Sequence, residues 1–367
     1  MPISANKHLE DCDCCELREE LRKRETESVT GQKKAGKSRA LGAFDTKALA
    51  KKLIEKERAE YGVGDRKLVY GNDDREDIFQ ITDTRIQNQS RAVMALIDAS
   101  KIRDNGDGTS TVRTMQFSQA QMLCPSEPFG AQPTAPHCTG FLVAPDIVAT
   151  AGHCINNNDL ARTRFFFGFQ MIDHNTPKVM IPSDDIYRGI EIIDRKLENT
   201  DSDYALVRLD RPAINRPVLT VRRGGKIPDD SHVYVIGHPS GLPMKFADGA
   251  FVRDNSHAIF FTANLDTYGG NSGSPVFNQA TGDVEGILVR GDTDFVFNGS
   301  CRVSNVCPIN GCRGEDVTRA SEFVAGIPQQ APPDIPPVSV HLADRISDIE
   351  DKLDQIGEDL ADIKRQL

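Results

Sequence analysis

The stretch that decides the fold is Gly269-Gly270-Asn271-Ser272-Gly273-Ser274-Pro275. Its glycines leave the main chain bare around Ser272, so the amides of Gly270 and Ser272 can point together at one small anion. A short stretch of this kind is more often a turn than a reactive site. Its meaning therefore depends on what lies upstream.

Two upstream segments supply the partners that a reactive serine needs. His153 lies in Thr150-Ala151-Gly152-His153-Cys154, and Asp203 opens the run Asp203-Tyr204-Ala205-Leu206-Val207-Arg208-Leu209. A serine hydroxyl is a weak nucleophile at neutral pH, so an imidazole must accept its proton and a carboxylate must orient that imidazole. The order His, Asp, Ser is the one used on a double β-barrel. Asp201 is the alternative carboxylate, less favoured because the apolar alternation begins after Asp203.

The surroundings of His153 favour this interpretation over an ordinary core histidine. Phe141-Leu142-Val143 and Ile147-Val148-Ala149 flank a Pro-Asp turn, which predicts a hairpin. A disulfide between Cys138 and Cys154 could staple across it. The histidine is thus expected at the end of a strand.

Together these segments resemble the chymotrypsin-fold serine peptidases, and most of all their bacterial glutamyl endopeptidase branch. The resemblance spans residues 69–327 and also rests on Asp266 to Val276 and on Val69-Tyr70-Gly71-Asn72-Asp73-Asp74-Arg75, which is similar to the start of the mature enzyme in that branch. It implies His153 as base, Asp203 as its partner, Ser272 as nucleophile, and an oxyanion hole formed by Gly270 and Ser272.

The implied fold is all-β, with two antiparallel six-stranded barrels in a peptidase domain of residues 68–327. The first barrel would occupy about 68–210 and the second about 229–320. Short alternating runs supply the strands, which we expect at 92–97, 141–143, 147–149, 165–171, 186–193 and 205–209, and then at 232–236, 250–253, 258–262, 273–277, 286–290 and 315–320. The turn at 104–108 predicts a hairpin between 92–97 and 111–115, and 321–326 a short terminal helix.

The substrate pocket is less clear from the sequence. Asp266 lies six residues before Ser272, where tryptic enzymes place the carboxylate that binds Lys or Arg, but the glutamyl branch also has an aspartate there. That branch carries a histidine for the substrate carboxylate on the strand after the nucleophile, where this chain has Leu288. Thr267 remains as a pocket wall and Arg290 as a candidate positive charge. The charge preference stays open.

The cysteines and the N-terminal segment point to different compartments. The chain has nine cysteines, and disulfides persist mainly in oxidising compartments, whereas residues 1–30 contain no recognisable secretory signal. We expect a Cys138–Cys154 bond and one bond within the 301–312 loop, with Cys301 and Cys312 as candidates, and at least one free thiol or intermolecular link. The cysteine spacing at 301–312, without a nearby histidine, does not match a zinc site. The missing signal favours the cytoplasm, with secretion as the alternative.

The ends of the chain differ from its middle. Residues 1–67 are polar, with two helical stretches, and are either a propeptide removed after Lys67 or an interaction arm that remains attached. Residues 328–339 form a Pro-rich linker. In 340–367, apolar residues recur at spacings of four and three, namely Leu342, Ile346, Ile349, Leu353, Ile356, Leu360, Ile363 and Leu367. This pattern predicts a coiled-coil helix that joins three or four chains.

Composition excludes several other classes of function. The net charge of −10 argues against a nucleic-acid partner, and no apolar run is long enough to predict a membrane span. Gly31 to Ser38 matches the phosphate-loop pattern, but the segment before it is too polar to be a buried strand. We therefore expect no metal and no organic cofactor. The sequence predicts a serine endopeptidase, and the alternative is a catalytically silent peptide-binding or scaffold protein on the same fold.

Overall fold

The computed structural model describes residues 69–70, 73–197, 202–291, 293–309 and 311–328. The chain divides into two compact units between Ile327 and Pro328, and apart from Pro328 the described residues belong to the first. The expected N-terminal region 1–67, the rest of the linker and the coiled-coil helix 340–367 lie outside them. In the described part, no helix is long and apolar enough to cross a membrane.

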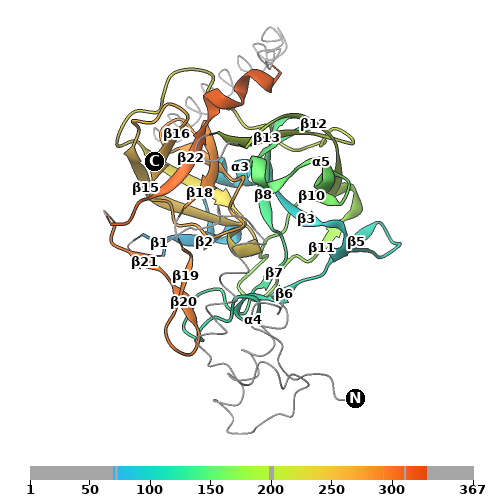
Figure 1. Cartoon of the computed structure of the whole chain (residues 1–367). Helices are drawn as coiled ribbons and strands as arrows, with labels where there is room; N and C mark the ends of the chain where they lie inside the picture. The colour runs from blue at the N-terminus through green and yellow to red at the C-terminus, as the bar shows by residue number, and fades with distance from the viewer. Residues whose placement is uncertain (1–68, 71–72, 198–201, 292, 310, 329–367) are drawn as a thin grey trace, which may run out of the picture. The chain divides into compact units, whose positions relative to one another are not determined.

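The first barrel closes from six antiparallel strands in the order β10-β12-β13-β9-β8-β3 (Figure 1). Their bounds are β3 (Val93–Asp98), β8 (Cys138–Ala144), β9 (Ile147–Thr150), β10 (Thr163–Phe167), β12 (Ile186–Leu197) and β13 (Asp203–Leu209). The β8–β9 hairpin turns at Pro145 and Asp146, as the sequence predicts. This barrel is confirmed, and its strand β13 begins at Asp203.

The second barrel has the order β14-β17-β18-β22-β16-β15 and closes through a further β14–β15 pairing. Its strands are β14 (His232–Gly237), β15 (Lys245–Asp254), β16 (Phe260–Ala263), β17 (Pro275–Asn278), β18 (Val284–Arg290) and β22 (Glu315–Arg319). All six coincide with strands expected from the sequence. The prediction of two six-stranded barrels is thus confirmed for the described residues.

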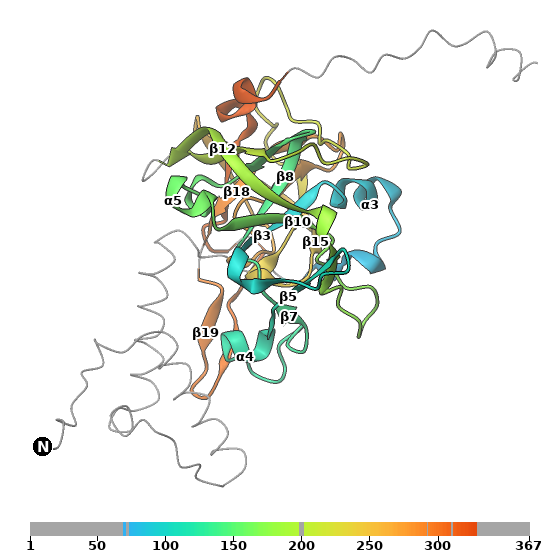
Figure 2. The ribbon, with the colours of Figure 1, turned by 90° about the vertical axis from the view of Figure 1, so that its right-hand side faces the viewer.

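Smaller elements surround the two barrels. Three short α-helices occur among the described residues, namely α3 (Thr84–Ser90), α4 (Phe117–Gln121) and α5 (Asn157–Leu160). The minor strands are β4 (Ile102–Asp104), β5 (Thr109–Val112) and β11 (Met180–Pro182) in one sheet, β6 (Met115–Gln116) with β7 (Pro133–Thr134), and β19 (Phe295–Phe297) with β20 (Arg302–Ser304). Figure 2 shows α4 and β19 below the barrels.

Two local expectations differ from the structure. The turn at 104–108 joins β4 to β5, because left-handed Gly106 and Gly108 reverse the chain between those two short strands, and neither strand is in the barrel. The short terminal helix expected at 321–326 is present as two 3₁₀ helices, Ala320–Glu322 and Val324–Gly326, instead of one continuous helix.

The start of the domain also differs, because it joins the second barrel rather than the first. Strand β2 (Arg75–Asp77) pairs with β15, and β1 (Val69–Tyr70) pairs in parallel with β21 (Val306–Cys307).

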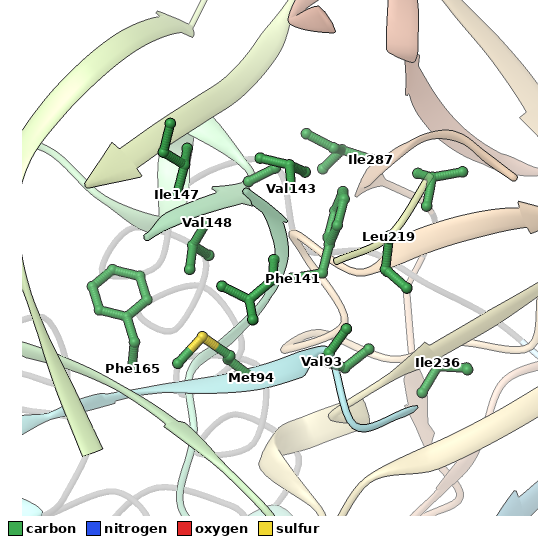
Figure 3. Close-up of a cluster of buried hydrophobic side chains, with 14 of the residues drawn as sticks. Val93, Met94, Phe141, Val143, Ile147, Val148, Phe165, Leu219, Ile236 and Ile287 are labelled. Atoms are coloured by element: carbon green, nitrogen blue, oxygen red, sulfur yellow. The ribbon is translucent and has the colours of Figure 1, made fainter. Parts of the chain in front are cut away.

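One hydrophobic cluster fills the first barrel and continues into the seam with the second. Figure 3 shows Val93, Met94 and Phe141 of the first barrel close to Ile236 and Ile287 of the second, with Leu219 from the crossover segment. Each such side chain stabilises the fold by about 1.5–3 kcal/mol when it is fully buried. The shared cluster therefore fixes how one barrel sits on the other, and with it any site built across the seam.

Candidate active site

His153 and Asp203 meet at the edge of the first barrel. His153 lies in a 3₁₀ turn (Gly152–Cys154) directly after β9, and Asp203 is the first residue of the neighbouring strand β13. The His153 Nδ1 atom lies 2.8 Å from Asp203 Oδ2, and the His153 amide donates to Asp203 Oδ1 at 3.1 Å. The carboxylate thus holds both the ring and the main chain of the histidine.

The environment of Asp203 keeps its carboxylate ionised. Burial alone would raise the pKa of Asp203, but the hydrogen bonds and charge of His153 outweigh it and bring the pKa below its ordinary value. Gly152 leaves room for this carboxylate, since a Cβ atom there would lie 3.1 Å from Asp203 Oδ1 and only 2.2 Å from the Lys196 carbonyl oxygen. The alternative carboxylate, Asp201, lies outside the described residues.

Ser272 approaches this pair from the second barrel, on the loop that precedes β17. Its carbonyl oxygen accepts the Thr139 amide at 2.9 Å and lies 3.6 Å from Cys154 Sγ. Cys154 directly follows His153, so the main chain of Ser272 lies beside the turn that holds His153. Ser272 itself is buried.

The loop before Ser272 directs the Gly270 amide. Gly270 has a φ of +89°, and a Cβ atom there would lie 2.8 Å from the His238 carbonyl oxygen. The Ser240 amide donates to the Gly269 carbonyl. Because a trans peptide points its C=O and N–H in opposite directions, the Gly270 N–H points away from Ser240. The Gly270 amide, one of the two expected donors of the oxyanion hole, therefore does not face the loop that contains Ser240.

Three disulfides tie the described residues together. Cys138 pairs with Cys154, as expected, and so holds the histidine turn against β8. Cys301 pairs with Cys124 rather than with Cys312, and Cys312 pairs with Cys307. The expectation for Cys301 was wrong because the segment between β6 and β7, which contains Cys124, lies against β20, where the amide of Cys124 donates to the Arg302 carbonyl.

A metal centre is not supported at the one group of possible ligands found among the described residues. The candidate ligand atoms of Cys138, His153 and Cys154 lie within 4.8 Å of one another. The two sulfurs are already joined in a disulfide, so neither can bind a metal as a thiolate.

Asp266 contacts the main chain at the start of the domain. It is buried, and its two oxygens accept the amides of Tyr70 at 2.6 Å and Asp74 at 2.9 Å. Burial raises the pKa of Asp266 to about 7, against the lowering effect of these two hydrogen bonds. This side chain therefore anchors the segment that begins the domain, a role that the sequence did not suggest.

The other expected pocket residues divide between the barrel core and a polar cluster. Leu288 is fully buried in the core of the second barrel, and its carbonyl accepts the Gly273 amide at 2.8 Å. The Thr267 hydroxyl donates to Glu315 at 3.1 Å, and Arg290 Nε lies 3.2 Å from Asp316. Glu315, a fully buried carboxylate on β22, was missed because alternation marks it only as a strand residue.

Two other histidines, His238 and His257, belong to the second half of the domain. His238 is fully buried, its Nδ1 lies 3.0 Å from the Leu242 carbonyl oxygen, and burial lowers its pKa to about 4. His257 stacks on Phe260 with ring centroids 4.0 Å apart.

The family model described as trypsin-like peptidase domain matches residues 138–287, a range that includes His153, Asp203 and Ser272. Residues 138–287 of this chain are thus similar to a trypsin-like peptidase domain. The resemblance to chymotrypsin-fold serine peptidases, expected from the sequence, is thereby confirmed.

Individual relatives of the peptidase domain are distant. The chain is 31% identical over 155 residues to a glutamyl endopeptidase of Bacillus licheniformis. The matched stretch covers 39% of this chain and 46% of that protein, so the chain spans about half of the relative's length. Among solved structures, a Glu endopeptidase in complex with MPD matches with a TM-score of 0.41 and 16% identity, over 71% of this chain and 97% of that one. The Vibrio cholerae VesB protease matches with a TM-score of 0.42 and 15% identity, over 69% and 65% of the respective chains.

Proposed function

We propose that this protein is a serine endopeptidase in which His153, Asp203 and Ser272 form the catalytic triad. The observation that carries the proposal is the contact of His153 Nδ1 with the ionised Asp203, next to the main chain of Ser272 at the barrel seam. An aspartate in this position keeps the histidine in the tautomer whose other nitrogen can accept a proton. The family match over the same residues supports the assignment.

In the proposed reaction, the Ser272 hydroxyl attacks the carbonyl carbon of a peptide bond while His153 takes the hydroxyl proton. The resulting oxyanion accepts hydrogen bonds from the amides of Gly270 and Ser272, each worth about 3 kcal/mol of barrier. Collapse breaks the C–N bond, and His153 gives its proton to the departing amine. Water, deprotonated by the same histidine, then hydrolyses the acyl-enzyme.

The proposed substrate is an extended stretch of protein or peptide. Strand β18 ends at Arg290 beside the Ser272 loop, and in this family such a strand lends its backbone to the substrate. The Bacillus licheniformis relative is a glutamyl endopeptidase, but the expected histidine is replaced here by Leu288 in the barrel core. We therefore do not carry the preference for glutamate over to this chain.

Two further features belong to the proposal. Removal of residues 1–67 would release a domain that starts beside Asp266, and the C-terminal helix at 340–367 would gather three or four catalytic heads. Three disulfides within one domain are typical of oxidising compartments, which supports the secreted alternative over the cytoplasm.

A fluorophosphonate probe, which reacts with activated serines, tests the proposal. We expect intact or trypsin-processed protein to be labelled and to hydrolyse peptides, and Ser272→Ala to lose both properties while it stays folded. Ser274→Ala is the matched control, because this buried serine lies two residues away on the same loop. Folded protein that is neither labelled nor active before and after processing would favour the silent peptide-binding alternative.

A further inference from the structure

The two peptide groups that flank Gly270 are both held by donors from outside their own loop. The Ser240 amide donates to the carbonyl of Gly269, and the Thr139 hydroxyl donates to the carbonyl of Gly270 at 2.9 Å. Thr139 belongs to β8 of the first barrel, whereas Ser240 follows β14 of the second. Ser240 therefore holds the peptide that carries the Gly270 N–H, and Thr139 holds the next peptide, so contacts from both barrels fix the main chain on either side of Gly270.

These contacts matter because glycine does not fix its own conformation. Gly270 has a left-handed φ of +89° and no side chain, so little resists rotation of the peptide before it. Such a rotation would turn the Gly270 N–H away from the place where the oxyanion forms and turn a carbonyl oxygen toward it. An oxyanion donor stabilises the transition state only if it is aimed there in advance.

Thr139 is itself immobilised by a complete set of hydrogen bonds. Its side chain is fully buried, and its hydroxyl oxygen accepts the His238 amide at 3.1 Å. Its amide donates to the Ser272 carbonyl at 2.9 Å, and its carbonyl accepts the Thr150 hydroxyl at 2.7 Å. Because one lone pair of the hydroxyl faces the His238 amide, its hydrogen is left to point at the Gly270 carbonyl.

We infer that Thr139 is a positioning residue for the oxyanion site, acting through Gly270 and through the His238 loop that supports it. The inference rests on the proposed peptidase function and adds a specific role for a residue outside the triad. Thr139 connects the first barrel, which holds His153 and Asp203, to the loop of the second barrel that holds Ser272. It thus aligns the oxyanion donor with the triad.

The test is Thr139→Val, which keeps the shape of the side chain and removes the hydroxyl. We expect kcat on a peptide substrate to fall about 10- to 100-fold, part of the loss seen when an oxyanion donor is removed altogether. KM should change by less than about threefold, because the Gly270 amide binds the carbonyl oxygen of the bound substrate more weakly than it binds the oxyanion of the transition state. A peptide boronic acid, which mimics the tetrahedral state, should lose affinity in proportion to kcat/KM.

Two controls separate positioning from stability. Thr139→Ser keeps the hydroxyl and should restore kcat to within a few-fold of wild type. Thr163→Val removes a similarly buried hydroxyl, bonded to the Asp159 carbonyl in the first barrel, and should leave kcat unchanged. If Thr139→Val does not fold, Thr139→Ala takes its place.

The outcomes also separate the two proposals. An active wild type with unchanged kcat in Thr139→Val, or with equal losses in Thr139→Val and Thr139→Ser, would overturn the inference about Thr139. A loss of kcat without loss of boronic acid affinity would also overturn it. A folded wild type that neither hydrolyses peptides nor binds the boronic acid would instead overturn the proposed function.

Discussion

At Asp203, an effect on catalysis can be distinguished from an effect on folding stability. It accepts hydrogen bonds from both the ring and the amide of His153, and its pKa lies below the ordinary value. An asparagine there could keep the shape of the site but would offer an N–H to His153 Nδ1. The histidine would then adopt the wrong tautomer.

We therefore predict that Asp203→Asn lowers kcat by about 10⁴-fold while the protein remains folded. Steady-state kinetics with a chromogenic peptide measure the effect, and circular dichroism checks the fold. Asp194→Asn is the matched control, because among the described residues Asp194 accepts a side-chain hydrogen bond from the Tyr204 hydroxyl on the adjoining strand and none from His153. A loss of less than tenfold in Asp203→Asn would point to Asp201 as the carboxylate.

Asp266 makes a separate prediction about pH. Its pKa is about 7 in the folded chain, because burial outweighs the amides of Tyr70 and Asp74, whereas the unfolded chain has the ordinary, lower value. The folded state therefore holds the proton more tightly. The contribution of this carboxyl to stability is full below the ordinary pKa and is lost as pH rises through about 7.

We expect the Tm of the wild type to fall between pH 5 and pH 8 relative to that of Asp266→Asn, whose side chain does not titrate. Differential scanning calorimetry of both proteins at several pH values measures this difference, and other titrating groups cancel in the comparison. Parallel Tm curves would show that the Asp266 carboxyl is already ionised at pH 5 in the folded protein.

These residues show what a single sequence can and cannot establish. His153, Asp203 and Ser272 could be proposed because each lies in a local pattern of glycines, cysteines or alternation. The partners of Asp266 could not, because its hydrogen bonds join positions separated by 196 and 192 residues. Thr139 was missed for the same reason, since its hydroxyl bonds Gly270 on the other barrel.

At the scale of elements, alternation located the twelve barrel strands well. It failed where a short strand pairs outside the barrels, as for β4 and β5, because alternation does not say which strand is the partner. The pairing of Cys124 was also missed, because no other cysteine lies near it in the sequence. The segment that contains Cys124 lies against β20, and its disulfide partner Cys301 is 177 residues away.

That disulfide should contribute more stability than its neighbour. In the chain-entropy description, closing a loop of the Cys124–Cys301 length is worth about 5 kcal/mol, and closing the Cys307–Cys312 loop about 2 kcal/mol. We predict a larger drop in Tm for Cys124→Ala/Cys301→Ala than for Cys307→Ala/Cys312→Ala. Calorimetry of oxidised proteins measures it, and equal drops would show that local strain, rather than loop length, controls both bonds.

At the scale of the whole molecule, two barrels share one hydrophobic cluster (Figure 3), and the candidate site lies at their seam. A site of this kind depends on both halves, since His153 and Asp203 come from one barrel and Ser272 from the other. The sequence predicted this division from the order of the three residues. It did not predict that the segment beginning at Val69 would attach to the second barrel.

The C-terminal helix leads to a prediction about assembly, drawn from sequence because residues 340–367 lie outside the described part. With Ile346 at position a, leucine recurs at a and isoleucine at d, a choice that disfavours two strands and favours three or four. In a parallel bundle Arg345 and Asp359 at g would face Glu350 and Lys364 at e, which is attractive.

We therefore expect the full chain to sediment as a trimer or tetramer and a chain ending at Pro337 as a monomer, with equal kcat for each catalytic head. A strict seam of two apolar residues in seven is narrower than a helix needs to cover a globular surface, so docking onto the same chain is the weaker alternative. Replacing Leu353 and Leu360 with aspartate should give monomers without shortening the chain. A monomeric mass for all three proteins would show that the helix packs within its own molecule.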